Sequence, residues 1–319
     1  MKRTSLQLIP NTVKLLALFL LVSTSLSAAD KDNKTLHLKG AKFTYPLVEK
    51  WIAEYSKENP LSEVKTVLWQ ATEKESILNI VACQLSDSDL TADQTVAYVG
   101  RYALIPVSNK QNPIIAKAGK NGLSKKLLKK LFFEETDDYG DEPQEAKSKY
   151  TATVYARENK APTTITLARY FGANPTELKG KKVLGDDIYL LNAIKKDSTG
   201  VTFNSLSYVY DIHSRKLRSD IALLPLNLKS QQKEALNTLD IDNTIALLEK
   251  TSVESIPVGS FGFVLSKEQR NNRQITDFIK WILANGQKFN HEFGFLTLDN
   301  ATLTSQKNQL DDTFLSSIK

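Results

Sequence analysis

The chain has 319 residues, of which 41% are hydrophobic and 24% charged. This is an ordinary globular composition with room for one or two domains. The formal net charge is +6, and three of the basic residues lie within the first 27, so the rest of the chain carries +3. This small excess, without a basic stripe interleaved with aromatic residues, argues against nucleic-acid binding.

The first 29 residues have the pattern of a secretory signal peptide. A basic start precedes the apolar run LLALFLLV at 15–22, and small residues follow it. The apolar run is too short to span a bilayer comfortably. We expect cleavage after Ser27 or Ala29, and no cysteine follows the run that could carry a lipid anchor. These features predict an exported, periplasmic protein.

In the first half of the remaining chain, strand-like and helix-like segments alternate. The patterns predict, in order, a strand at 36–40, a helix at 46–59, a strand at 64–69, a helix that runs into a short strand at 71–82, a strand at 96–107 and a helix at 124–133. Cys83, the single cysteine, lies in an apolar run and is expected to be a buried, inert thiol. In the helix at 124–133, Leu123, Leu127 and Leu131 have helical spacing, which predicts a solvated lysine face opposite them.

The second half continues the alternation after an acidic, breaker-rich loop at 134–149. We expect a strand at 150–156, a helix at 162–172 closed by Gly172, a helix at 186–196, strands at 199–210, 219–226 and 255–265, and a helix at 272–286. The tail after about residue 300 is polar and is expected to be loosely held. The alternation predicts the α/β class with a largely parallel sheet.

Two short motifs suggest an enzyme or a metal site, and neither fits its surroundings. Asp240 and Asp242 match the D-x-D-x-T signature of phosphatases that use an aspartate nucleophile with Mg²⁺. That chemistry needs a buried strand before the motif, and EALNT does not provide one. The two aspartates are therefore interpreted as turn and helix-capping residues. The three histidines are scattered, so no metal site, cofactor or catalytic group is predicted.

The stretch YARENKAPTTIT at 155–166 has features of an anion site. Pro162 suits the first turn of a helix, which leaves the amides of Thr163 and Thr164 without intrahelical partners. These amides, the helix dipole and the guanidinium of Arg157 all favour an anion. The alternative stays open that the threonines only cap the helix and that Arg157 pairs with Glu158 or with the acidic loop.

Several stretches resemble, in the same order, the periplasmic phosphate-binding proteins of phosphate ABC transporters. They are KGAKFTYPLVEKWIAEY (39–55), SKKLLKKLFF (124–133), YARENKAPTTITLARYFG (155–172), TGVTFNSLSYV (199–209) and DFIKWILANGQKFNHEFGFLTL (277–298). The resemblance implies a two-lobed, type II-like solute-binding fold with a hinged cleft. It places lobe 1 at 30–107 plus 253–319 and lobe 2 at 108–252. It also implies phosphate or a related oxyanion as ligand, an ABC-transporter permease as partner, a monomer, and no enzymatic activity.

The same resemblance implies a set of ligand-binding residues. These are Lys42, Phe43, Thr44, Arg157, Thr163, Thr164, Thr199 and Gly200. The family's glycines in the segment after Arg157 are replaced here near Ala161 and Pro162. Its acceptor aspartate would lie near Ala82–Leu85, where this chain has ACQL. These departures suggest an alternative function, an envelope interaction protein that retains the fold without anion binding.

Overall fold

The computed structural model describes residues 35–67, 76–119, 121–133 and 152–316. The chain divides into the segment Met1–Lys34 and the compact unit Thr35–Lys319, and all described residues belong to the second. The expected signal peptide and acidic loop lie outside the described residues. So do parts of the expected elements at 64–69, 71–82 and 150–156.

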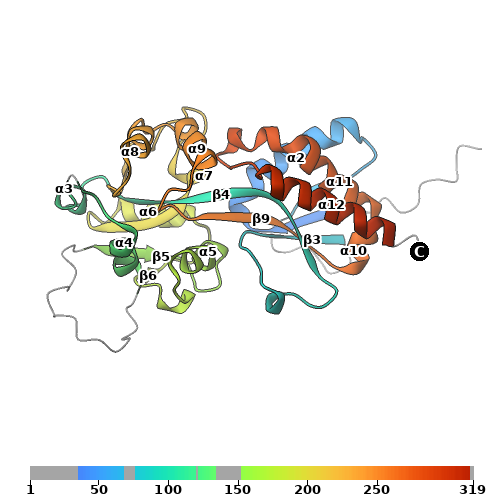
Figure 1. Ribbon diagram of the computed structural model, residues 1–319, viewed down its shortest axis with the longest axis horizontal. Coiled ribbons are helices and arrows are strands. Elements are labelled where there is room, and N and C mark those ends of the chain that lie inside the picture. Colours follow the sequence, from blue (N-terminus) through green and yellow to red (C-terminus); the bar gives the residue numbers. More distant parts are fainter. Residues whose placement is uncertain (1–34, 68–75, 120, 134–151, 317–319) are drawn as a thin grey trace, which may run out of the picture. The chain divides into compact units, whose positions relative to one another are not determined.

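Nine strands of the described residues form one mixed sheet in the order β2-β1-β3-β9-β4-β7-β5-β6, with β8 paired to β4 (Figure 1). Their bounds are β1 Leu36–Gly40, β2 Val64–Thr66, β3 Ser76–Val81, β4 Thr95–Asn109, β5 Thr153–Ala156, β6 Lys181–Lys182, β7 Gly200–Ser205, β8 Ile221–Leu223 and β9 Val258–Leu265. The strands β2-β1-β3 and β6-β5-β7 are parallel, whereas β9 and β4 pair antiparallel with all their neighbours. The α/β class is confirmed, and the expected predominance of parallel pairing is wrong at the centre of the sheet.

Strand β4 joins the two groups of parallel strands. Its residues Thr95–Ala103 pair with β9, and its residues Leu104–Ser108 pair with β7. Most of its side chains are buried, including the continuous stretch Tyr102–Asn109. Such a run is typical of a strand that is covered on both faces.

The helices include every one that the sequence predicts at 46–59, 124–133, 162–172, 186–196 and 272–286. Their bounds are α2 Tyr45–Glu58, α3 Ile114–Lys117, α4 Lys125–Phe132, α5 Pro162–Phe171, α6 Ile188–Lys195, α7 Leu206–Val209, α8 Ser230–Asn237, α9 Ile241–Lys250, α10 Lys267–Asn271, α11 Arg273–Asn285 and α12 Asn300–Ser316. Gly172 ends α5 with a φ of 60°, a conformation that glycine adopts without steric cost. None of the described helices combines the length and apolarity that a membrane span requires.

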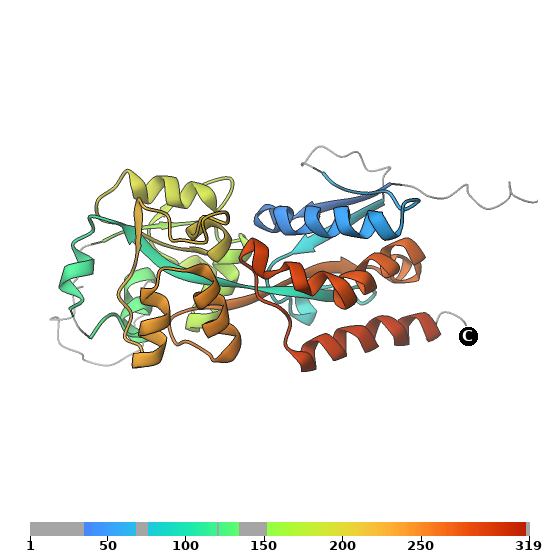
Figure 2. The ribbon, with the colours of Figure 1, turned by 90° about the horizontal axis from the view of Figure 1, so that it is seen from above.

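The expectation of a loosely held tail is wrong, because residues 300–316 form α12. Asp299 precedes the helix and accepts a hydrogen bond from the amide of Thr302 (2.9 Å). Leu310 is buried, and Gln306 Oε1 accepts a hydrogen bond from the amide of Tyr98 (2.7 Å). Figure 2 shows α12 running beside α11. Capping and packing thus order a sequence that has little amphipathic pattern.

Two further expectations need correction. The predicted strand at 199–210 ends at Ser205, and residues 206–209 form the helical turn α7. In α4, the buried positions are Leu128 and Phe132, and Leu127 is 38% exposed. Leu123 lies before the Ser124 cap, outside the helix, so its spacing to Leu127 does not define a helix face.

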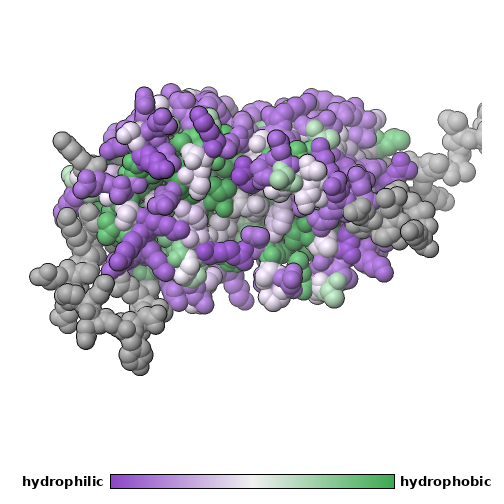
Figure 3. All heavy atoms as spheres, in the orientation of Figure 1, coloured by the Kyte–Doolittle hydropathy of each residue, from purple (hydrophilic) through white to green (hydrophobic). Residues whose placement is uncertain are grey.

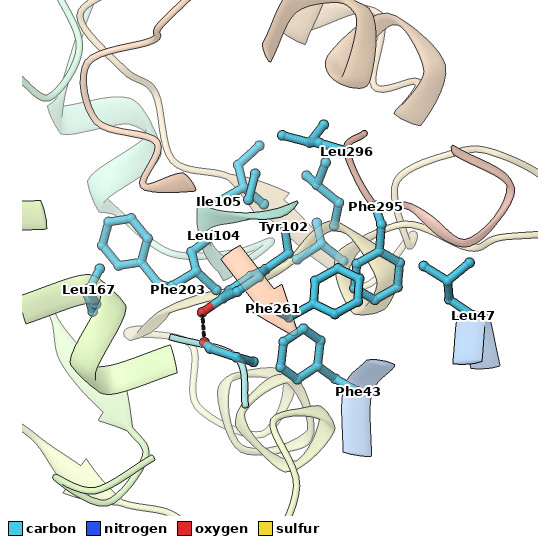
Figure 4. Close-up of a cluster of buried hydrophobic side chains, with 14 of the residues drawn as sticks. Phe43, Leu47, Tyr102, Leu104, Ile105, Leu167, Phe203, Phe261, Phe295 and Leu296 are labelled. Atoms are coloured by element: carbon cyan, nitrogen blue, oxygen red, sulfur yellow. Dashed lines mark hydrogen bonds between the residues drawn. The ribbon is translucent and has the colours of Figure 1, made fainter. Parts of the chain in front are cut away.

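A buried aromatic cluster fills the core beside β4 (Figure 4). The ring of Phe43 lies 5.0 Å from that of Tyr102 and 6.0 Å from that of Phe295. The Tyr102 hydroxyl donates a hydrogen bond to the carbonyl oxygen of Ala82 and shares a second one with Thr166 Oγ1 (2.8 Å) on α5. This phenol therefore connects β4, the end of β3 and α5 in the interior.

Candidate functional site

The corner after β5 is built by local sequence. Arg157 follows the last strand residue directly, and the turn behind it is closed by a hydrogen bond from the Ala161 amide to the Glu158 carbonyl (2.9 Å). Ala161 is extended, as a residue before proline must be, and Pro162 opens α5. The side chain of Ala161 cannot cap the helix, so the first-turn amides depend on other partners.

Thr163 and Thr164 are both buried at the start of α5. Thr163 Oγ1 donates a hydrogen bond to Asp187 Oδ1 (3.1 Å). Neither threonine caps α5 in this structure. The two hydroxyls and the positive end of the helix dipole are therefore directed into the protein beside Arg157.

Arg157 forms one loose ion pair. Its Nη1 lies 3.5 Å from Asp187 Oδ1, and the two side chains are only 12% and 10% exposed. Its Nε is buried and has no hydrogen-bond partner among the residues that the structure describes. An unsatisfied buried donor costs about 1–3 kcal/mol, and more on a charged group. The guanidinium thus retains unused donor capacity inside the protein.

Asp187 is the acidic group of the corner, and our sequence analysis missed it as a site residue. Burial raises the pKa of its carboxyl to about 6; Asp186 raises it further, whereas Arg157 and the Thr163 hydrogen bond act in the opposite direction. Its backbone oxygen accepts a hydrogen bond from Asn204 Nδ2 (2.7 Å), which attaches it to β7. A carboxyl with this pKa can be charged or neutral near physiological pH.

Tyr208 adds a phenol to the same region. Burial raises the pKa of that phenol, and the nearby Asp186 and Asp187 raise it further. The phenol is therefore neutral and can donate a hydrogen bond. Its hydrogen bond is made with Asp186, the neighbour of Asp187 in the chain.

The cavity at the corner is small. It measures about 20 Å³, and its polar lining comes from Tyr155, Arg157, Thr163, Thr164 and Thr202. A cavity needs at least about 10–15 Å³ to hold one water molecule. The site in this structure therefore has space for a water but not for a phosphate.

Of the other predicted site residues, Lys42, Phe43 and Thr44 form a short 3-10 turn before α2. Lys42 is exposed, whereas Phe43 and Thr44 are buried. Thr44 Oγ1 donates to the carbonyl of Ala41 (2.7 Å), and Phe43 packs on Tyr102. This turn reaches the α5 helix through the Tyr102 phenol, and no hydrogen bond or ion pair among the described residues joins it to Arg157.

Thr199 and Gly200 do not join the corner. Gly200 pairs with Thr153 at the beginning of the parallel strands β5 and β7, whereas Arg157 follows the end of β5. Thr199 Oγ1 hydrogen-bonds with Asp197 Oδ1 and with Thr153 Oγ1, both at 2.8 Å. The structure thus places these two residues at the N-terminal ends of β5 and β7, whereas Arg157 lies at the C-terminal end of β5.

The segment Ala82–Leu85 offers one backbone carbonyl to β4 and one to α5, and it has no carboxylate. Ala82 accepts from Tyr102, and Gln84 accepts from Arg169 Nη1. Cys83 is buried, as expected, and burial raises the pKa of its thiol, which disfavours the reactive thiolate. Asp87 lies beyond this segment in a short 3-10 turn and is exposed.

The phosphatase-like motif has a structural role. The Asp240 side chain caps α9 by accepting hydrogen bonds from the amides of Asp242 and Asn243, and it pairs with Lys216 (3.0 Å). Asp242 pairs with Arg215. The capping interpretation of Asp240 is confirmed. Among the described residues, no cluster of His, Cys, Asp and Glu could hold a metal ion.

No protein-family model and no curated protein matches this chain. Among solved structures, it is similar to a phosphate ABC transporter substrate-binding protein of Clostridium perfringens with bound phosphate (12% identity, TM-score 0.53, 83% of this chain and 100% of that one). It is also similar to an ABC-type phosphate transport receptor of Vibrio cholerae (13% identity, TM-score 0.53, again 83% and 100%). At these identities the likeness shows the fold alone, which is that of two-lobed periplasmic binding proteins of type II.

Proposed function

We propose that this chain is an exported solute-binding protein that captures phosphate or a related oxyanion and delivers it to the permease of an ABC transporter. It works as a monomer and makes or breaks no covalent bond. One observation carries the proposal: Arg157, with an unused buried Nε, lies at the N-terminus of α5 beside Thr163 and Thr164. A fold shared with two phosphate receptors supports it.

In this proposal the oxyanion replaces part of the Arg157–Asp187 pair. A loose pair at 3.5 Å is a weak competitor for a guanidinium that can bind an oxyanion through two donors. The threonine hydroxyls and the first-turn amides of α5 supply further donors. The acceptor aspartate of the phosphate-binding family has no counterpart at Ala82–Leu85, and Asp187 would take its role. Its carboxylate can accept a hydrogen bond from a protonated oxygen of phosphate, whereas sulfate carries no such proton.

Ligand access requires a conformational change, since the corner cavity holds only about 20 Å³. We propose that lobe 1 (30–107 plus 253–319) and lobe 2 (108–252) separate by bending of the strands that join them. The pairing partner of β4 changes from β9 to β7 between Ala103 and Leu104, which makes this a natural bending point. Lys42, Phe43 and Thr44 would face the ligand from lobe 1, whereas Thr199 and Gly200 would not.

The test is a calorimetric titration of the purified protein with phosphate, with the fluorescence of Trp51 and Trp281 as a second signal. We expect saturable binding with an affinity in the micromolar range or tighter. Arg157→Ala should weaken it by at least about a hundredfold, because two charge-assisted hydrogen bonds are lost. Arg273→Ala, which removes an exposed arginine, is the matched control and should bind like wild type. Wild-type affinity in Arg157→Ala would overturn the proposal.

A second candidate function is an envelope interaction protein that has kept the fold without binding an anion. The observation in its favour is that Asp187 already neutralises Arg157 in a nearly closed corner. This function predicts no heat with phosphate or sulfate at any pH between 5 and 8. It also predicts co-purification of one defined envelope protein at a fixed ratio.

A further inference from the structure

A second and larger cavity lies away from the Arg157 corner. It has a volume of about 380 Å³ and shares no lining residue with the corner cavity. Strand β8 and the segment that follows it form one side, and residues of α3 and α8 lie around it. Its volume falls within the range of about 300–1,000 Å³ that is usual for small-molecule sites.

Aliphatic side chains dominate the lining. Ten of the lining residues are leucine or isoleucine, among them Ile221 and Leu223 of β8 and Leu236 of α8. Figure 3 shows hydrophobic residues gathered over the region where Figure 1 places α3, α8 and the adjoining part of β4, with hydrophilic residues around them.

Leu239, another lining residue, has an unusual backbone conformation. Its φ is +52°, in the left-handed region that a branched side chain rarely adopts, and it is 42% exposed. Hydrogen bonds from its own amide to Leu236 and from the Leu217 amide to its carbonyl maintain this conformation. Leu239 follows the end of α8, and its partly exposed side chain belongs to the lining of the cavity.

The charged residues of the lining all have the same sign. They are Lys110, Arg218 and Lys233, and no aspartate or glutamate lines the cavity among the residues that the structure describes. Arg218 is held in place because its Nε donates to the carbonyl of Tyr208 (2.7 Å). Asp220 does not line the cavity and pairs with Lys195 (2.6 Å). An apolar interior with a cationic rim fits a molecule that has an aliphatic body and an anionic head.

We propose that this cavity binds a medium-chain aliphatic carboxylate. A dry apolar cavity of about 150 Å³ accommodates benzene, so about 380 Å³ has room for roughly 15 non-hydrogen atoms. Dodecanoate has this size. Its chain would pack on the leucines of β8 and α8, and its carboxylate would lie toward Lys110 and Arg218.

The test is a calorimetric titration of the purified protein with dodecanoate and with dodecanol, both kept below their aggregation limits. Saturable binding of dodecanoate is expected, with dodecanol about tenfold weaker or worse because it cannot pair with the cationic rim. Ala222→Phe, which adds a ring within the lining, should abolish binding. Lys110→Glu should weaken it about tenfold, whereas Lys117→Glu, a change on α3 outside the lining, should leave it unchanged.

Phosphate titrations of the same variants separate this cavity from the Arg157 corner. Ala222→Phe should bind phosphate like the unaltered protein, which also shows that the variant is folded. The inference is overturned if dodecanoate does not bind saturably, if dodecanol binds equally well, or if Ala222→Phe still binds dodecanoate while its circular dichroism matches that of the unaltered protein.

Discussion

At the scale of single residues, the corner illustrates a balance between an anion site and an internal ion pair. Arg157 and Asp187 are both nearly buried, and Thr163 hydrogen-bonds to the carboxylate. Desolvation of two charges offsets much of their attraction, so such pairs contribute little net stability. This desolvation is the main cause of the raised pKa of Asp187. Because the charged carboxylate of Asp187 is poorly stabilised, an anionic ligand can replace it as the partner of Arg157.

The raised pKa of Asp187 predicts a pH-dependent difference in stability between the protein and Asp187→Asn. The folded-state pKa of about 6 exceeds the ordinary pKa of an aspartate, 3.8, so the native state binds the proton more tightly than the unfolded state. The stabilising contribution is complete below pH 4 and is lost as the pH rises through 6. The shift corresponds to about 3 kcal/mol. Urea unfolding at pH 4 and at pH 7.5 should show the unaltered protein losing roughly this much relative to Asp187→Asn. A difference that is constant with pH would contradict the assignment.

At the scale of elements, α9 is anchored through its last turn as well as its first. Glu249 Oε1 accepts hydrogen bonds from the amide and the hydroxyl of Thr297, at 2.7 and 2.8 Å, and lies 2.9 Å from His291 Nε2. Although burial acts to raise the pKa of Glu249, these partners lower it to about 2. One carboxylate therefore ties the C-terminal turn of α9 to the segment that follows α11.

This anchor predicts that Glu249→Gln is destabilised at neutral pH. The folded-state pKa lies below the ordinary pKa of a glutamate, 4.5, so the stabilising contribution is present above pH 4.5 and is lost as the pH falls toward 2. The full shift is discounted because the side chain is partly exposed, which leaves about 1–2 kcal/mol. Thermal unfolding at pH 7 should show the loss, and at pH 3 the two proteins should differ by less. Glu234→Gln, an exposed change on α8, is the control and should be neutral at both pH values.

At the scale of the whole molecule, sequence reasoning found what is local and missed what the fold assembles. Arg157, Thr163 and Thr164 lie within eight positions of one another, so the turn and the helix start were enough to place them together. Asp187 joins them only because β6 and α6 return the chain to that point, and no local pattern indicates this. Thr199 and Gly200 were expected from a resemblance, and the strand register places them at the N-terminal ends of β5 and β7. From sequence alone, an aspartate at the start of a predicted helix is expected to cap that helix, and only the structure shows that Asp187 does not.

The hydroxyl of Tyr102 is a buried group that joins the two proposed lobes by hydrogen bonds, so its removal tests how strongly it holds them together. Its hydroxyl bonds to Ala82 in lobe 1 and to Thr166 in lobe 2. In Tyr102→Phe both bonds disappear and the Ala82 carbonyl is left unsatisfied, so the free energy of unfolding should fall by about 1–3 kcal/mol. With the bond between the lobes removed, the ligand-free protein should open more easily, and small-angle scattering should give a larger radius of gyration. Tyr189→Phe, which alters an exposed tyrosine, should change neither quantity. A lower free energy of unfolding without a larger radius of gyration would show that Tyr102 contributes to stability alone. It would refute a role of Tyr102 in holding the lobes together.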